Sequence, residues 1–307
     1  MRPFVKLLWP LVSFHFCVSC NLPVDTKYVF CIAYCKDHCH RVFYYCQVAT
    51  WHLCVCVFEC RCIDGYSRKI IWLKASYTNH KPELIASYFT DSTREVGGYP
   101  RRVRTDKGTE NVIVAAIQAA VTGSTTGHLY GTSPGNQRIE AWWSFFRRCR
   151  SQFWIELFEN LSEYGAFHPH VSREIDCLRF CFMDIIQQDL DAVRREWNTH
   201  RIRPSTGAQC PAGIPDELYY LPQPPAVQCL LTDTPPLPVQ LMERLEQRRS
   251  CEDVDFGLYL DYLCQHQGFH MPVDVDTATS LYFDLVKCIH WVNVPRVFSC
   301  VINICLC

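Results

Sequence analysis

The stretch that decides the fold is residues 69–111, KIIWLKASYTNHKPELIASYFTDSTREVGGYPRRVRTDKGTEN. Its opening part, residues 69–77, is apolar and rich in β-branched and aromatic side chains, which predicts a buried strand. Residues 82–96 predict a helix with a proline in its first turn and an apolar face. Thr78 or Asn79 is the expected N-cap of that helix, because short polar side chains satisfy free backbone N–H groups there.

The neighbouring segments continue the alternation of strand and helix. Residues 100–105 predict a short strand, and residues 111–121 predict a helix. Residues 123–135 are polar and rich in glycine, which predicts a loop. Two long helices are expected next, over residues 138–161 and 172–197, where apolar residues recur at helical spacing. This order of elements predicts an α/β fold with helices packed on a sheet.

The composition is that of a folded chain and not of a strongly basic one. The sequence has 307 residues, of which 49% are hydrophobic and 20% charged, so it has the apolar content needed to bury a core. The formal net charge is −1. Any binding of nucleic acid must therefore come from a local group of basic residues and not from overall charge.

The 21 cysteines are unevenly distributed and help to divide the chain. Ten lie in residues 1–62, five in residues 63–230 and six in residues 231–307. The cysteine-poor middle has clear strand and helix patterning, unlike a small disulfide-linked secreted domain. We therefore predict an irregular Cys-rich extension (1–42), a core domain whose first strand is degenerate (43–222), and a Pro-rich linker with a small helical extension (223–307).

The N-terminus resembles a signal peptide only weakly. Arg2 and Lys6 precede an apolar run, but Pro10 and His15 interrupt it. No segment is long and uniformly apolar enough to predict a membrane-spanning helix.

Two acidic residues stand at positions suited to chemistry. Asp106 follows a predicted strand, and in α/β folds ligands bind at the ends of strands. Glu140 begins a predicted helix after a flexible loop, where it is also favoured simply by the helix dipole. If the fold brings these two carboxylates together, they can hold a divalent metal ion.

Four motifs in the correct order resemble the catalytic core of the integrase family. Residues 105–111, TDKGTEN, resemble the motif of its second aspartate, and residues 133–140, SPGNQRIE, resemble the motif of its glutamate. Residues 63–68, IDGYSR, resemble the turn after its second strand, and residues 197–201, WNTHR, resemble its N-x-x-R motif. The nearest resemblance is to integrase-core proteins derived from mobile elements in animal genomes.

The resemblance implies an RNase H-like mixed sheet flanked by helices. It also implies three acids that bind Mg²⁺ or Mn²⁺ and catalyse strand transfer of DNA, with Asp106 and Glu140 as the second and third. It further implies DNA as partner, a homodimer and a nuclear location.

The first acid of such a site is missing. Asp64 is the tempting candidate, but the span between Asp64 and Pro82 has room for only one more strand, so Asp64 belongs to the turn between the second and third strands. The first acid should lie upstream, near residues 44–50, YYCQVAT, where no acid occurs. Asp37 is too far upstream, and Glu59 is too near.

These observations favour a DNA-binding integrase-like domain that is catalytically impaired. An active metal-dependent strand transferase, with Asp64 or Glu59 replacing the lost ligand, is one alternative. A domesticated interaction module without enzymatic activity is another. The missing acid is explained either by non-coding sequence translated within residues 1–62 or by a domesticated, inactive copy.

Basic residues surround the two acids and are candidates for contact with phosphate, although exposed arginines often only solvate a surface. The DNA-binding candidates are Arg104, Lys107, Arg138, Arg147 and Arg148. Trp142 and Trp143 could stack on bases, but their spacing predicts that at least one belongs to the core. The group Cys35, His38, Cys39 and His40 lacks the spacing of a zinc module, so zinc is not expected.

Overall fold

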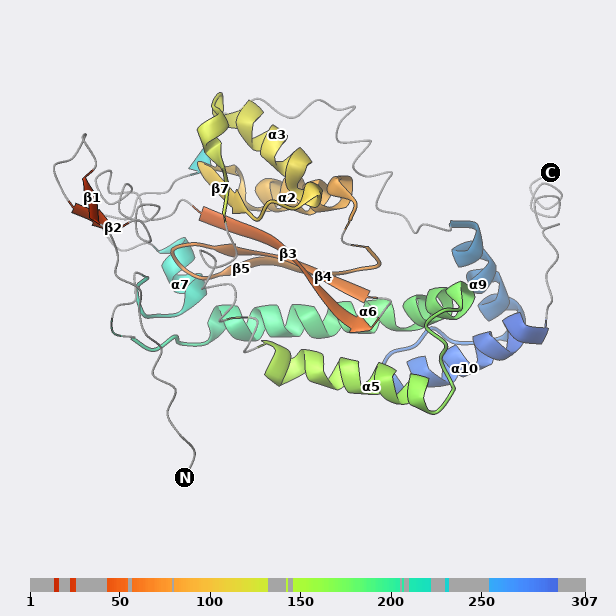
Figure 1. Cartoon of the computed structure of the whole chain (residues 1–307). Coiled ribbons are helices and arrows are strands. Elements are labelled where there is room, and N and C mark those ends of the chain that lie inside the picture. The colour runs from red at the N-terminus through yellow and green to blue at the C-terminus, as the bar shows by residue number, and fades with distance from the viewer. Residues whose placement is uncertain are drawn as a thin grey trace.

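The computed structural model describes residues 14–16, 23–25, 43–54, 57–78, 80–131, 142, 146–204, 206, 210–221, 230–231 and 254–291 (Figure 1). Its strands are β1 (Phe14–Phe16), β2 (Pro23–Asp25), β3 (Phe43–Cys54), β4 (Val57–Asp64), β5 (Ile70–Ser76), β6 (Tyr99–Pro100), β7 (Arg102–Thr105), β8 (His128–Tyr130) and β9 (Leu230–Leu231). Its helices are α2 (Pro82–Val96), α3 (Val112–Thr122), α5 (Gln152–Glu163), α6 (Ser172–Thr199), α7 (Pro215–Tyr220), α9 (Val254–Gln267) and α10 (Val275–Trp291).

The centre of the molecule is a five-stranded sheet in the order β5-β4-β3-β7-β8. The first three of these strands in the chain, β3, β4 and β5, form an antiparallel meander. Strand β7 lies parallel to β3, and β8 lies parallel to β7. Helices α2 and α3 cover one face of the sheet, and α6 with α5 covers the other (Figure 1). The prediction of an α/β fold is confirmed.

Three sequence-based expectations need correction. The predicted loop over residues 123–135 contains a 3₁₀ turn (Thr125–Gly127) and the strand β8, which was missed because three residues carry too little alternation to reveal a strand. Helix α2 begins after Lys81 and has no side-chain cap, while Thr78 is buried before it. The helix expected from residue 138 contains a π-helical turn (Arg147–Ser151) before α5, which ends at Glu163.

Side chains of α6 hydrogen-bond to the outer edge of β5. Asn198 accepts a bond from the N–H of Ile70 (2.8 Å) and donates one to its carbonyl (2.9 Å). One to three turns earlier, Arg194 donates to the carbonyl of Ile71, and Gln187 bonds to Leu73 and Ala75. These bonds satisfy backbone groups of an edge strand that would otherwise be exposed to water or buried without partners.

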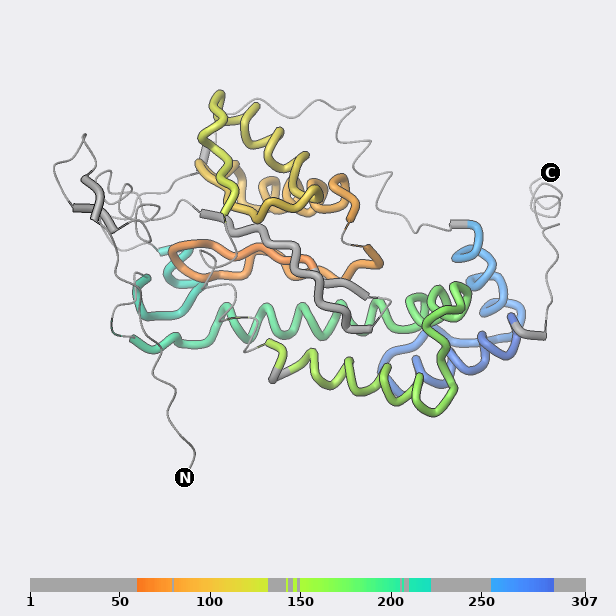
Figure 2. The backbone as a smooth tube through the Cα atoms, viewed as in Figure 1, coloured from red at the N-terminus to blue at the C-terminus, as the bar shows by residue number. Residues whose placement is uncertain are grey.

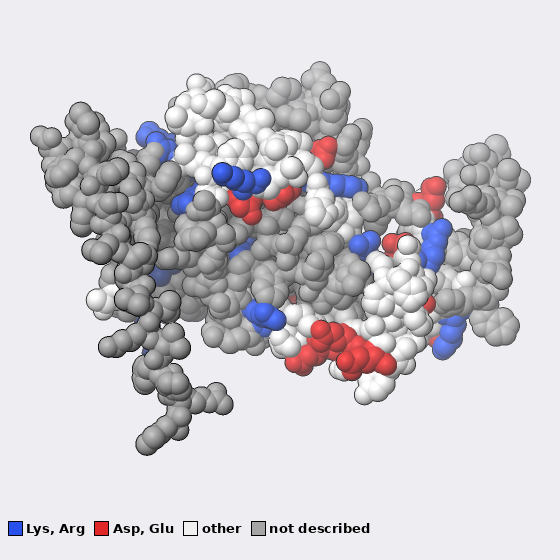
Figure 3. Space-filling view, viewed as in Figure 1, with Lys and Arg blue, Asp and Glu red and all other residues white. Residues whose placement is uncertain are grey.

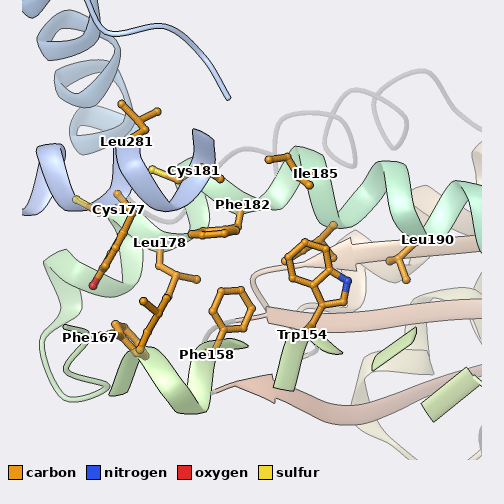
Figure 4. Packing of buried hydrophobic residues seen from close by; sticks show 14 of the residues in the cluster. Trp154, Phe158, Phe167, Cys177, Leu178, Cys181, Phe182, Ile185, Leu190 and Leu281 are labelled. Atoms are coloured by element: carbon orange, nitrogen blue, oxygen red, sulfur yellow. The ribbon is translucent and has the colours of Figure 1, made fainter. Parts of the chain in front are cut away.

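The two faces of the sheet carry separate apolar cores. On the α2 and α3 side the core contains Ile85, Phe89 and Val114 packed against Trp72 of β5. On the other side α5 and α6 pack through edge-on aromatic rings (Figure 4). Helices α9 and α10 lie beside the first half of α6 (Figure 2) and join the same cluster. The helices of the C-terminal region thus share one core with α6. No helix among the described residues is long and apolar enough to cross a bilayer.

The bond pair of Asn198 generates a stability prediction. Replacing Asn198 with Leu should lower the free energy of unfolding by about 2–4 kcal/mol, because a buried N–H and a buried carbonyl of Ile70 lose their partners. Urea denaturation followed by tryptophan fluorescence measures the change. The neighbouring Thr199→Ala, whose hydroxyl bonds only to carbonyls of its own helix, should change stability by less than about 0.5 kcal/mol. Equal effects of the two substitutions would contradict the assigned role.

Candidate metal and DNA site

Asp106 directly follows the last residue of β7, which fixes the position of its backbone. The ladder between β7 and β8 closes with the N–H of Gly131 donating to the carbonyl of Thr105 at 2.7 Å, and Asp106 is the next residue of the chain. The half-buried Asp106 carboxylate accepts bonds from the N–H of Gly108 (3.4 Å) and from the amide of Asn111 (2.8 Å). The turn after the strand therefore holds this carboxylate in one orientation.

Asn111 links Asp106 to a second carboxylate, that of Glu110. Its Nδ2 donates to Asp106 Oδ1 and, at 3.1 Å, to Glu110 Oε1. The Asn111 side chain is fully buried at the start of α3, and its Oδ1 has no hydrogen-bond partner within the described residues. The two carboxyl groups are close enough for the charge of Asp106 to act on Glu110.

Both carboxyl groups have a raised pKa. Burial is the main cause of the raised pKa of Asp106, and bonds from Gly108 and Asn111 oppose it. Burial is likewise the main cause for Glu110, and the negative charge of Asp106 adds to it, while His80 lowers the pKa. Burial penalises the charged form of each group, so a positive partner placed between them would be favourable.

Gly108 makes room for the carboxylate of Glu110. Its backbone torsions, φ −67° and ψ 146°, are open to any residue. A Cβ at this position would nevertheless overlap the Glu110 carboxylate. Glycine at residue 108 is therefore not needed by the backbone, but it leaves the space that the Glu110 carboxylate occupies.

Asp64 has a structural role at the end of β4. It is 4% exposed, and its Oδ2 accepts bonds from the N–H of Ser67 (2.7 Å), the hydroxyl of Ser67 (2.6 Å) and the N–H of Tyr66 (3.3 Å). In register it lies opposite Tyr44, which is level with Val103 of β7. The Asp64 backbone is thus two strands, roughly 10 Å, across and three residues, roughly 10 Å, along from Asp106.

The strand register locates the position that faces Asp106 from β3. Tyr45 pairs with Arg104, so continuing this parallel register by two residues brings Gln47 level with Asp106. In the other direction Gln47 pairs with Arg61 of β4, and Glu59 pairs with Ala49. Residues 43–54 contain no acid. The strand beside Asp106 therefore offers glutamine where a carboxylate ligand would stand.

Glu140 lies outside the described residues, but the helix position two residues later is described. Trp142 is 2% exposed, stacks on Phe146 with ring centroids 5.0 Å apart, and meets Trp197 of α6 edge-on. The guanidinium of Arg61 lies 4.9 Å from the Trp142 ring. Trp142 is thus a core residue, as its helical spacing suggested, while Trp143 lies outside the described residues.

The basic candidates have different surroundings. Lys107 and Arg147 are exposed, whereas the half-buried Arg104 places its guanidinium against Gly131. Arg138 lies outside the described residues, as does the side chain of Arg148. Arg150 is held by Asp189 and Glu196 of α6.

On the face shown in Figure 3, basic side chains form several small groups and acidic ones gather over α5. The acids that α5 contributes are Glu156, Glu159 and Glu163. The surface over α5 is therefore unsuited to DNA.

Comparison with known proteins identifies the family. A family model described as an integrase core domain matches residues 37–217, which is more than half of the chain. The chain belongs to the integrase core domain family. Neither the comparison with curated proteins nor that with solved structures found a match. Membership implies an RNase H-like fold and an ancestry in DNA integration or transposition.

Integrase cores typically use divalent metal ions. Within the described residues, no group of three or more His, Cys, Asp and Glu side chains is arranged to hold one. One observation nevertheless fits a cation beside Asp106: the Glu110 carboxylate, for which Gly108 leaves space, shares the Asn111 Nδ2 donor with the Asp106 carboxylate. The sequence pattern included Glu110 and Asn111 in the motif but gave them no role, because spacing alone does not show which side chains fold back on the turn.

The strand end that carries Asp106 is supported by a buried histidine. The hydroxyl of Thr105 donates to the carbonyl of Asp106 (2.8 Å), so Nε2 of His128 is the donor in its 3.2 Å bond to that hydroxyl. Burial lowers the pKa of His128 to about 4. In the unfolded chain a histidine has a pKa of about 6.5.

His128 therefore makes stability depend on pH. Between about pH 6.5 and 4, His128 binds a proton in the unfolded chain but not in the folded one. The stability that depends on a neutral His128 is therefore complete above pH 6.5 and is lost as the pH falls towards 4. When the pH is lowered from 7.5 to 5, the free energy of unfolding should fall by about 2 kcal/mol more in the wild type than in His128→Gln. Urea denaturation at both pH values measures the difference, and the exposed His270→Gln serves as control. Identical pH dependence in wild type and His128→Gln would refute the assignment.

Proposed function

We propose that this integrase core binds DNA and is impaired in strand transfer because its first metal-binding acid is absent. The observation that carries the proposal is the register of β3 against β7, which pairs Tyr45 with Arg104 and, continued by two residues, brings Gln47 level with Asp106. Two ions about 3.5–4 Å apart need several oxygen ligands to hold them. Without a carboxylate on β3, Asp106 and Glu140 provide too few oxygen ligands to hold two ions.

The RNase H-like arrangement supports this proposal. An antiparallel meander of three strands, followed by two strands parallel to the first, puts the first and fourth strands of the sheet side by side. Acids on these two strands would then share one ion. A bound divalent cation supplies charge that activates a water or a 3′-hydroxyl and steadies the leaving oxygen. The residues present fit the binding of one such ion better than two.

The alternatives predict different chemistry. In an active strand transferase Asp64 or Glu59 would replace the lost acid, but Asp64 is engaged in its own turn and its strand is not adjacent to β7. In an interaction module without enzymatic activity, the fold would bind neither DNA nor metal. A nuclear location and a homodimer remain part of the proposal.

The DNA-binding part predicts an effect of exposed basic residues. Lys107→Ala and Arg147→Ala should each weaken binding of a duplex oligonucleotide, and each should reduce the slope of log affinity against log salt by about 0.9. Fluorescence anisotropy at several salt concentrations measures both quantities. Lys287→Ala on α10 removes the same charge from an exposed position, 69% for the side chain, and should leave the slope unchanged. Absence of salt-dependent binding would favour the interaction module instead.

The impaired-catalysis part predicts a gain of activity. Gln47→Asp should increase nicking of supercoiled plasmid in Mn²⁺ by about tenfold or more, since it provides a carboxylate level with Asp106. The wild type should show little nicking, and Asp106→Asn added to Gln47→Asp should abolish the gain. Robust nicking by the wild type that depends on Asp106 would instead establish an active enzyme.

A further inference from the structure

The turn after β7 contains more oxygen donors than the integrase motif alone assigns. Asp106 and Glu110 bring their carboxylates to the same amide group, the Nδ2 of Asn111. An N–H donor between two carboxylates occupies the place that a small cation would take. The other atom of that amide, Oδ1, is buried and has no hydrogen-bond partner within the described residues.

Rotation of the Asn111 amide converts this arrangement into a ligand set. A turn of 180° about the Cβ–Cγ bond exchanges Nδ2 and Oδ1, so that the oxygen faces the carboxylates. Without a cation this rotation is unfavourable, because it removes two hydrogen bonds and sets an oxygen against two carboxylates. With a cation present the amide oxygen becomes a third donor, and carboxylate and amide oxygens are ligands that Mg²⁺ and Mn²⁺ accept.

We propose that Asp106, Glu110 and Asn111 form a binding site for a single divalent cation, with Glu110 taking the part of the acid missing from β3. This proposal rests on the proposed function, because Asp106 belongs to both. Glu110 reaches the site only because residue 108 has no Cβ. One ion held in this way is compatible with impaired strand transfer, which requires two.

Titration of the full chain with Mn²⁺, followed by the electron paramagnetic resonance signal of the free ion, tests the site. The wild type should bind one ion, and Glu110→Gln should weaken binding by about tenfold or more, since even loss of a group that supports a ligand costs about 10–100-fold. Asp106→Asn should have an effect of the same size. Glu159→Gln, a matched change at an exposed position of α5, should bind as the wild type does.

Gly108→Ala gives the sharpest variant. Alanine suits the torsions at this position, so the fold should keep its stability in the absence of metal. The added methyl group displaces the flexible Glu110 side chain, so Mn²⁺ binding should fall as it does in Glu110→Gln. Circular dichroism and thermal denaturation without metal verify that the fold is intact.

The outcomes separate this proposal from the proposed function. Unchanged Mn²⁺ binding in Glu110→Gln, or no Mn²⁺ binding by the wild type, would overturn the cation site. DNA binding through Lys107 and Arg147 is measured in the presence of a chelator and does not depend on the site. Absence of DNA binding would overturn the proposed function. DNA binding together with unchanged Mn²⁺ binding in Glu110→Gln would overturn only the cation site.

Discussion

The structure depends on the hydrogen bonds between α6 and the open edge of β5. Because Gln187, Arg194 and Asn198 bond in turn to the backbone of β5, they fix the position of the helix along the strand. Trp197, next to Asn198, donates to the carbonyl of Arg68 and meets the ring of Trp142. These polar side chains thus block further strand pairing at this edge, and the neighbouring Trp197 holds the buried ring of Trp142 against α6.

The same helix explains why the C-terminal region belongs to the folded body. The first half of α6 extends past the sheet, and its Cys177, Leu178 and Phe182 are buried there against α5, α9 and α10 (Figure 4). Burial raises the pKa of both thiols, to about 12 for Cys177 and well above its ordinary value for Cys181. These cysteines therefore behave as apolar core residues and not as reactive thiols.

Much of this architecture was predictable from the sequence, and the failures have physical causes. The strand at β5 and the helices α2, α3 and α6 carry strong periodicity or turn signals, and the structure agrees with them. The strand β8 is short and lies between glycines, so only pairing with β7 reveals it. The π-helical turn before α5 has no residue signature of its own, so the apolar spacing alone predicted one continuous α-helix. The placement of α9 and α10 depends on contacts far apart in sequence, which no local pattern contains.

In the candidate site, too, the sequence predicted the positions that depend on local signals but not the contact between side chains. The turn position of Asp64 followed from chain length alone, and the strand end that carries Asp106 followed from its motif. That Glu110 folds back over Gly108 could not be inferred from spacing, because it depends on the absence of one carbon atom. Loss of an acid from β3 would leave Asp106 without a neighbouring carboxylate, yet the turn itself brings Glu110 to it. An amide that now bridges two carboxylates as a donor would, once rotated, offer its oxygen to a metal ion instead. The cation site would then be contained within a single turn, and it would not require the acid lost from the sheet.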